Sequence, residues 1–532
     1  GDLRGEWNYP DGTVIGKTIS IDLDAGEPEK LVRLETQILH RDSGSWRSYS
    51  YTWNEDQTDA TLAGVPGFDK TLSIADADAP GGIRQQTWHF AGRTECLLCH
   101  TTRGGSVYGF NIGQLNRDFD YGSASDNQLR TLAHIGIFKE PLATGAKPTE
   151  APLDQLAKTT DPSDFGAELQ SRAKSYLHVN CAHCHRRGGG GTAAIEVPLE
   201  IKLEKSNLVS RPTQGTFGLA DSWVVAQGDP YSSTLYYRMA KVGRGRMPHF
   251  GSQVVDEGGI RLIHDWIKQL SADPAGPDIR EATPEEAAAA RKLKTANESS
   301  LLLLTGGLGV KSSLQDAAID RLLSSTQGAL MLSSFLRGFG RDLSAAIQKN
   351  AIARGVAHSD PQVRDLFEPF IPEEKRVRRL GNTINAEEIL VLRGDADRGR
   401  EFYLKAPGVQ CRNCHQTGSE GKELGPKFDG IGKRLSRAEI LVNILEPSRK
   451  VEEKYRTWLV ETDAGKVYSG LLALKTDKEV RLRDATGKEI VIPAGEVDLL
   501  LEQRKSIMPE LQLKDMTAQE VADLLAFLES LK

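Results

Sequence analysis

The chain has 532 residues and a formal net charge of -6. This length exceeds what one hydrophobic core supports and predicts three to five domains. The mild charge, with Lys and Arg spread along the chain, excludes nucleic acid as the main partner, and no stretch approaches the roughly 20 apolar residues that span a membrane.

The first 90 residues predict a β-rich region. Residues 31–39 loosely alternate apolar and polar side chains, as half-buried strands do. Residues 45–53 are rich in Ser, Tyr and Trp, and these residues together with residues 13–21 and 85–90 are further candidate strands. Aromatic residues in this region could form a carbohydrate platform, but aromatics are ordinary strand residues. We therefore expect the following aromatics to fill the sheet core: Trp7, Trp46, Tyr51, Trp53 and Trp88.

A Cys-x-x-Cys-His pattern follows at residues 96–100 and recurs at residues 181–185 and 411–415. It is typical of c-type haem attachment, in which two thiols bond to the haem and the His binds the iron. The three copies use all six cysteines. Zinc sites usually pair two Cys-x-x-Cys motifs, and a redox dithiol does not call for the His, so both alternatives are weaker. The sequence predicts three covalently bound haem c groups on these thiols and proximal histidines: Cys96, Cys99 and His100; Cys181, Cys184 and His185; Cys411, Cys414 and His415.

The first haem has no obvious second axial ligand, because no Met precedes Met239. His89 and His134 are the nearest candidates. The remaining option is an open sixth position, and an open iron can bind and activate small molecules.

The second motif follows a linker at about residues 144–163 and a predicted helix over residues 165–179. Met247 lies in a loop before a predicted helix over residues 258–270, as the distal Met does in small c-type cytochromes. We therefore predict Met247 as the distal ligand of the second haem. Met239 competes, but it lies on an apolar helical face and is better explained as a core residue.

Residues 278–392 contain no cysteine and have helical spacing, which predicts a helical spacer. The third motif follows a helix that starts near residue 399. A Gly425–Pro426 turn comes after it, and in cytochromes c the Pro carbonyl of such a turn holds the proximal His.

Four predicted strands between residues 455 and 492 form a small β insertion. A second Met-Pro loop and a final helix over residues 517–531 follow it. Met508 in this loop is the predicted distal ligand of the third haem. Met516 competes, but a capping contact at the start of the final helix explains it better.

These patterns predict an α+β multidomain fold of mainly α cytochrome c-like haem modules, with an antiparallel β region at the N-terminus and a β insertion in the last module. The expected domains are a β-rich region (1–90), a first haem module (91–160), a second cytochrome c-like module (161–277), the helical spacer (278–392), and a third cytochrome c-like module (393–532) with its β insertion at about 455–500.

Residues 395–532 resemble the planctomycete–verrucomicrobial type of c-type haem-binding domain. Residues 7–270 resemble bacterial multihaem cytochrome-like proteins of unassigned function. The first resemblance rests on residues 399–402, the third Cys-x-x-Cys-His motif, Gly425–Pro426, residues 445–448, the strand insertion and Met508–Pro509. The second rests on residues 49–58, 95–100, 114–118 and 176–181. Modules of both kinds often lie behind a sugar or alcohol dehydrogenase in a longer polypeptide, so the resemblance implies a dehydrogenase as electron donor.

We expect a tri-haem c-type cytochrome that transfers single electrons between redox proteins. The expected donor is a periplasmic dehydrogenase, bound transiently or fused upstream, and the expected acceptor is another cytochrome or an oxidase. Because c-type haem is attached outside the cytoplasm, we expect an upstream export signal and a periplasmic or extracellular protein. We expect an electron carrier, or the electron-transfer part of an oxidoreductase, rather than a stand-alone catalyst.

Two alternatives remain. The first is a peroxidase-like multihaem enzyme with an open first haem, which the missing Met near the first motif favours. The second is a binding or scaffold module in which haems act as structural staples, which the aromatic β region favours.

Overall fold

The computed structural model describes most of the chain. The described residues are 7–24, 31–64, 67–77, 79–93, 95–96, 100, 106–138, 153–186, 189, 191, 193, 195–249, 251–270, 284–306, 310–340, 342–406, 411–463, 467–484 and 487–532. They belong to two compact units, each drawn from three stretches of the chain. Unit 1 comprises Gly1–Arg211, Trp223–Tyr236 and Asp256–Glu281, and unit 2 comprises Pro212–Ser222, Tyr237–Val255 and Ala282–Lys532.

The predicted fold class of mainly α cytochrome c-like haem modules is wrong. Helices account for 38% of the structure and strands for 20%, so helices do not dominate, and no haem modules are shown. The expected antiparallel β region at the N-terminus is present. The C-terminal part is β-rich and contains more strand than the small β insertion that was expected there. One reason is that two strands that the sequence patterns did not indicate, β5 (Phe68–Ala75) and β15 (Val497–Ser506), each pair with a neighbouring strand.

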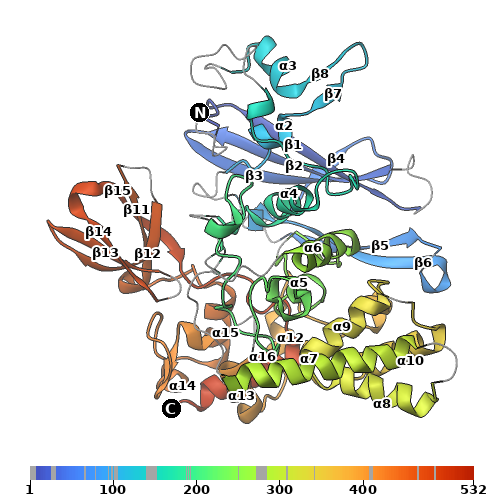
Figure 1. The fold of residues 1–532 in the computed structure, drawn as a ribbon. Helices are drawn as coiled ribbons and strands as arrows, with labels where there is room; N and C mark the ends of the chain where they lie inside the picture. Colours follow the sequence, from blue (N-terminus) through green and yellow to red (C-terminus); the bar gives the residue numbers. More distant parts are fainter. Residues whose placement is uncertain are drawn as a thin grey trace. The chain divides into compact units, whose positions relative to one another are not determined.

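A four-stranded antiparallel sheet opens unit 1 (Figure 1, blue). Its strands, in spatial order, are β1 (Val14–Asp22), β2 (Leu31–Asp42), β3 (Ser45–Trp53) and β4 (Ala60–Leu62). A separate hairpin pairs β5 with β6 (Ile83–Phe90). Leu34 of the sheet packs with Leu72 and Phe90 of the hairpin, and these three buried side chains join the two β elements.

The rest of unit 1 carries the first two Cys-x-x-Cys-His motifs. Its further elements are α2 (Ile112–Leu115), β7 (Asp118–Asp120), β8 (Ser125–Asn127), α3 (Gln128–His134), α4 (Leu169–Cys181) and α6 (Glu257–Gln269). Asp256 caps α6 and accepts a hydrogen bond of 2.8 Å from the Tyr176 hydroxyl of α4. A Cβ at Gly259 would overlap the Tyr176 ring, so glycine allows α4 and α6 to approach closely.

Helix α5 (Thr234–Met239) runs from the last residues of unit 1's second stretch into unit 2. Unit 2 then continues with a helical region (Figure 1, yellow). Its helices are α7 (Pro284–Thr305), α8 (Ser312–Leu323), α9 (Thr326–Leu336), α10 (Ala345–Val356) and α11 (Pro361–Arg364). Ser325 and Ser344 cap α9 and α10 by accepting hydrogen bonds from backbone N–H groups of the first turn. These helices lie within residues 278–392, the range of the predicted helical spacer, and belong to unit 2 together with residues up to Lys532.

A buried ion cluster holds the segment after α5 against the helices of unit 2. Lys241 Nζ lies 3.4 Å from an Asp365 carboxylate oxygen, and both side chains are 2% exposed. Arg379 binds Asp365 at 2.9 Å and Glu368 at 2.7 Å. Lys241 also donates to the Arg244 carbonyl at 2.9 Å, so the cluster fixes the loop that leads to Met247.

The third motif lies among short helices around one apolar core. These helices are α12 (Ala386–Leu390), α13 (Ala396–Lys405), α14 (Ile431–Arg434), α15 (Arg437–Leu445) and α16 (Ala518–Ser530). Tyr403 of α13 and Leu524 of α16 are buried in this core. A Cβ at Gly399 would overlap the Asp523 carbonyl, which explains why α13 crosses α16 through a glycine. Capping boxes at the starts of α15 and α16 fix where these helices begin.

A five-stranded antiparallel sheet is inserted between α15 and α16 (Figure 1, orange to red). Its spatial order is β14-β13-β12-β11-β15, and the strands are β11 (Arg456–Thr462), β12 (Val467–Lys475), β13 (Glu479–Arg483), β14 (Glu489–Pro493) and β15. Its buried core consists of four side chains: Val460, Val480, Leu482 and Ile492. Among the described residues, no helix has both the length and the apolar character to cross a membrane.

Candidate functional site

The third Cys-x-x-Cys-His motif forms a single helical turn. The N–H groups of Cys414 and His415 both donate to the Cys411 carbonyl, at 3.1 and 2.9 Å. This turn brings the two thiols and the imidazole together within five residues. Burial raises the pKa of Cys411 to about 11 and also raises the pKa of Cys414, so both groups are neutral thiols at neutral pH.

His415 is held in one orientation by its surroundings. Its Nδ1 lies 2.8 Å from the Pro426 carbonyl oxygen, and a carbonyl can only accept, so Nδ1 carries the proton. The Tyr403 hydroxyl donates to the His415 carbonyl at 2.6 Å. Burial lowers the pKa of His415, and the Pro426 carbonyl opposes this effect. The imidazole is therefore neutral at pH 7, with its lone pair on Nε2, which is the form that binds a metal.

Two neighbours of His415 also fit a proximal ligand. The Phe428 ring stacks on the imidazole with centroids 4.3 Å apart and an interplanar angle of 12°. A Cβ at Gly425 would lie 2.8 Å from Cε1 of His415, so only glycine leaves the ring its space. The predicted role of the Gly425–Pro426 turn, that its Pro carbonyl holds the His, matches this hydrogen bond.

The first motif repeats this arrangement in unit 1. The His100 N–H donates to the Cys96 carbonyl at 2.9 Å, and His100 Nδ1 lies 2.6 Å from the Ser106 carbonyl oxygen. Tyr108, two residues after that carbonyl, lies 5.2 Å from the His100 ring, just as Phe428 follows Pro426 by two residues. Burial lowers the pKa of His100, with a smaller contribution from nearby His183. Cys99 lies outside the described residues.

The second motif begins at the last residue of α4. The N–H groups of Cys184 and His185 donate to the Cys181 carbonyl at 3.1 and 2.8 Å, so this motif forms the same turn as the third. A Cβ at Gly191 would lie 2.9 Å from Nδ1 of His185, as one at Gly425 would crowd His415. Burial raises the pKa of Cys181 to about 12. The five described cysteines are all free thiols and are available to bond to haem.

The predicted distal methionines differ in burial from their competitors. Met239 and Met516 are buried core residues, 6% and 0% exposed. Met247 and Met508 lie in loops and are half-buried. Met508 belongs to the same unit as His415, whereas Met247 belongs to unit 2 and His185 to unit 1. The assignment of both methionines to iron stays a prediction.

His89, one candidate ligand of the first haem, has both ring nitrogens beside carboxylates. Nδ1 lies 2.6 Å from Asp69, and Nε2 lies 2.9 Å from Glu95. Burial lowers the pKa of His89, but its hydrogen bonds and ion pairs with these two acids outweigh burial and raise the pKa to about 9. An imidazolium with two engaged nitrogens has no lone pair for iron, so this geometry disfavours His89. The other candidate, His134, is an exposed residue at the end of α3.

The aromatic residues of the N-terminal region contact other side chains of unit 1. The Arg33 guanidinium lies 3.7 Å above the Trp53 ring, and Trp88 packs against the buried cluster of Leu34, Leu72 and Phe90. Trp7 packs on Phe138 with centroids 5.1 Å apart, and Trp46 on Tyr9 at 5.4 Å.

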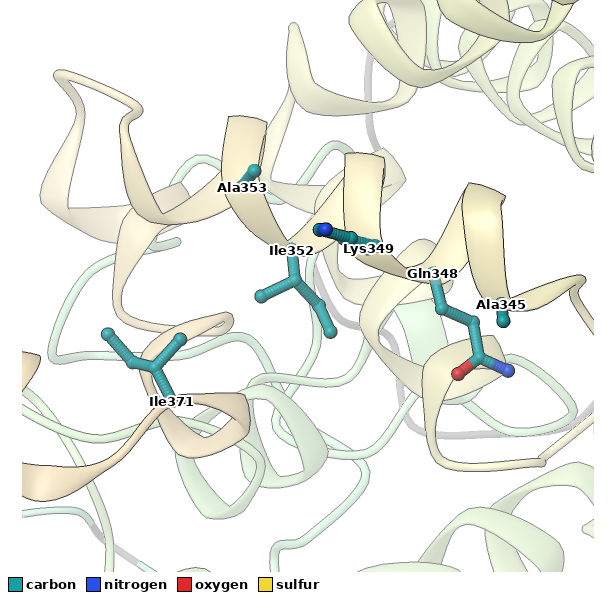
Figure 2. A pocket seen from close by; sticks show the side chains of 6 residues that line it. All are labelled: Ala345, Gln348, Lys349, Ile352, Ala353 and Ile371. Carbon is teal, nitrogen blue, oxygen red and sulfur yellow. The ribbon is translucent and has the colours of Figure 1, made fainter. Parts of the chain in front are cut away.

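A separate hollow of about 450 Å³ lies beside α10 in unit 2 (Figure 2). Its lining is mostly aliphatic, with one amide and one ammonium group: Ala345, Gln348, Lys349, Ile352, Ala353 and Ile371. These described lining residues include no acid–base pair. Within the described ranges, no group of three or more His, Cys, Asp or Glu side chains could hold a metal ion. A haem iron takes only its axial ligands from the protein, so such a group is not required at a haem site.

The two thiols and the oriented imidazole of the third motif are the donor set that a covalently bound haem requires. Sequence reasoning singled out the thiols, the histidines that follow them and the Gly425–Pro426 turn, but it missed the contacts that Ser106, Tyr108 and Phe428 make with these histidines. The signal available in the sequence was an aromatic residue shortly after the first and third motifs, Tyr108 and Phe428, each two residues after the carbonyl that accepts the Nδ1 proton. Comparisons with protein-family models and with curated proteins each found no match.

Proposed function

We propose that the protein is a tri-haem c-type cytochrome that transfers single electrons and works in the periplasm or outside the cell. The observation that supports it most is that His100 and His415 each donate a proton from Nδ1 to a backbone carbonyl. Each imidazole is therefore oriented and neutral, with Nε2 as the metal-binding nitrogen. A redox dithiol would not require this fixing of a His directly after the second Cys, and three Cys-x-x-Cys motifs do not pair into four-ligand zinc sites.

The thiols, histidines and methionines of the chain have different proposed roles in holding the haems. The thiols of each motif would hold the haem, and His100, His185 and His415 would bind its iron. Met247 and Met508 would supply thioether ligands to the second and third haems. Haem c, when bound, supplies reversible one-electron chemistry at iron, and thioether ligation raises its potential.

The proposed partners follow from the resemblance of the sequence to haem-binding modules that often lie behind a sugar or alcohol dehydrogenase. We propose a periplasmic sugar or alcohol dehydrogenase as donor, fused or bound transiently, and a downstream cytochrome or oxidase as acceptor. The chain itself is then a carrier rather than a catalyst that acts alone.

An anaerobic potentiometric titration tests the proposal. The full chain is produced in cells with c-type haem maturation machinery, and its visible absorption is recorded as the potential is lowered. We expect reversible reduction in separate one-electron steps, with the Met-ligated haems reduced at the higher potentials. A purified protein without a reducible haem chromophore would overturn the proposal.

A peroxidase-like enzyme is the second candidate, and the geometry of His89 favours it. Because His89 is held between Asp69 and Glu95, the first haem has one candidate ligand fewer, which favours an open iron. Carbon monoxide added to the reduced protein distinguishes the two functions. A response from about one haem in three, together with peroxide-dependent oxidation of a dye, would support the enzyme. No response would support the carrier.

A further inference from the structure

Tyr108 lies between two Cys-x-x-Cys-His motifs of unit 1. Its ring centroid is 5.2 Å from that of His100 and 5.8 Å from that of His183. His100 is the proximal ligand of the first proposed haem, and His183 stands between the two thiols of the second. One aromatic ring therefore contacts an iron ligand at one site and the attachment loop of the next.

The position of Tyr108 is fixed from the backbone. The Ser106 carbonyl accepts the His100 Nδ1 proton at 2.6 Å, so the chain two residues before Tyr108 is tied to the imidazole that Tyr108 contacts. At the other end, His183 is held within the turn formed when Cys184 and His185 donate to the Cys181 carbonyl. Both rings beside Tyr108 therefore belong to segments of defined geometry.

The corresponding ring of the third motif, Phe428, packs on His415 and also lies 5.9 Å from the ring of Tyr403. Phe428 stacks on His415 nearly parallel, at an interplanar angle of 12°. Tyr108 is tilted by 40° from His100 and by 56° from His183, so it does not stack fully on either ring. It makes moderate contacts with both, as expected for a ring that bridges two sites.

We propose that Tyr108 is the electron-transfer contact between the first two haem sites, through which the electron passes from one attachment segment to the other. The inference rests on the proposed function. In the exchange, one electron leaves a ferrous haem iron and reduces a ferric one, and no bond forms or breaks and no proton moves. The first two haems then act as a coupled pair.

The test uses the full holoprotein and the variants Tyr108→Leu and Tyr108→Phe. One haem is reduced by a short radiolysis pulse, and the following redistribution of the electron is recorded by absorption. The Leu variant, which keeps apolar bulk but has no ring, is expected to slow the exchange several-fold, while Phe retains the wild-type rate. Tyr121→Leu is the matched control, because Tyr121 is an exposed tyrosine of unit 1 that contacts Phe119.

A second pair of variants approaches the contact from its other end. His183→Leu removes the partner ring and is expected to slow the exchange as Tyr108→Leu does, while His183→Phe restores it. The absorption spectra and reduction potentials of all variants are recorded, since a purely structural change would shift these as well. If the Tyr108→Leu variant loses its first haem, the His183 pair still tests the contact.

The outcomes separate this inference from the proposed function. If the rate of electron exchange is unchanged in both Leu variants, or if the Phe variants slow it as much as the Leu variants do, the role of the ring is overturned. The haems remain bound in either case. A protein without covalent haem overturns the proposed function itself.

Discussion

The imidazole of His415 stacks on the ring of Phe428, with centroids 4.3 Å apart. Gly425 lies against the imidazole, and the Pro426 carbonyl receives the Nδ1 proton. These three contacts hold the His415 imidazole in one orientation. The imidazole of the third motif therefore has a fixed direction, with Nε2 free of the Pro426 hydrogen bond.

Substitution Gly425→Ala should disturb this ligand. The new Cβ would lie 2.8 Å from Cε1 and 3.1 Å from Nδ1 of His415, so the imidazole must move. We expect a loss of about 1–3 kcal/mol in the free energy of unfolding and a changed absorption spectrum of the third haem. Thermal unfolding and visible absorption measure the two effects. Gly495→Ala is the control, because a Cβ there meets no atom within 4 Å; equal behaviour of both variants would contradict the crowding.

Substitution Met508→Ala should open the third haem. If the Met508 thioether binds the iron, its removal leaves a coordination position that imidazole or carbon monoxide can occupy. A titration with either ligand, followed by absorption, measures the effect. Met516→Leu is the control, because Met516 is a fully buried core residue and its replacement keeps the volume. A Met508→Ala protein that binds no more ligand than wild type would exclude Met508 as the ligand.

His89 should make the stability of unit 1 depend on pH. Its pKa is raised to about 9 in the folded protein by Asp69 and Glu95, against the opposing effect of burial, and its ordinary value is 6.5. A raised pKa means that the protonated His89 stabilises the folded protein. This contribution to the free energy of unfolding is fully present below pH 6.5 and is lost as the pH rises through 9. We therefore expect His89→Gln to lower the free energy of unfolding by about 2 kcal/mol near pH 6.

Thermal unfolding of the wild type and of His89→Gln across this pH range checks the expectation. The difference between them should shrink towards pH 10. His134→Gln serves as the control, because His134 is exposed at the end of α3. A difference that does not depend on pH would show that His89 acts through packing alone.

The buried pair of Lys241 and Asp365 should be sensitive to removal of one charge. Asp365→Asn leaves the Lys241 ammonium, which is 2% exposed, without this counter-charge. Because loss of one partner of a buried ion pair leaves an uncompensated charge, we expect the free energy of unfolding to fall by about 3–5 kcal/mol. The double variant Lys241→Met with Asp365→Leu should recover part of the loss, since no uncompensated lysine remains.

Urea unfolding of unit 2 measures these changes. The control Asp320→Asn breaks the exposed pair with Arg354 and should cost less than about 1 kcal/mol. Equal losses in Asp365→Asn and the control would show that the buried cluster contributes no more than a surface pair.

Local patterns predicted much of the secondary structure. The alternation in residues 31–39 lies within strand β2, and the predicted strands between residues 455 and 492 are β11 to β14. The predicted final helix is α16, whose start is set by the Thr517–Glu520 capping box. Capping and alternation are properties of a few neighbouring residues, so one sequence is enough to detect them.

The arrangement of these elements could not be predicted in the same way. Unit 2 includes residues 237–255, which are taken from the middle of the predicted second module. The cause is in part the buried cluster of Lys241 with Asp365, residues more than a hundred positions apart, whose pairing leaves no local pattern. Tyr108 was missed for the same reason, because its contact with His183 joins two motifs that are separate in sequence.

Intact-mass spectrometry of the acid-denatured full chain tests the central claim most directly. The protein is produced with c-type haem maturation machinery, and denaturation releases every haem that is not covalently bound. The account predicts a mass increase equal to three haems, reduced by one haem when Cys411 and Cys414 are both replaced by Ala. A chain that keeps its six cysteines as free thiols and has the bare polypeptide mass would contradict the account.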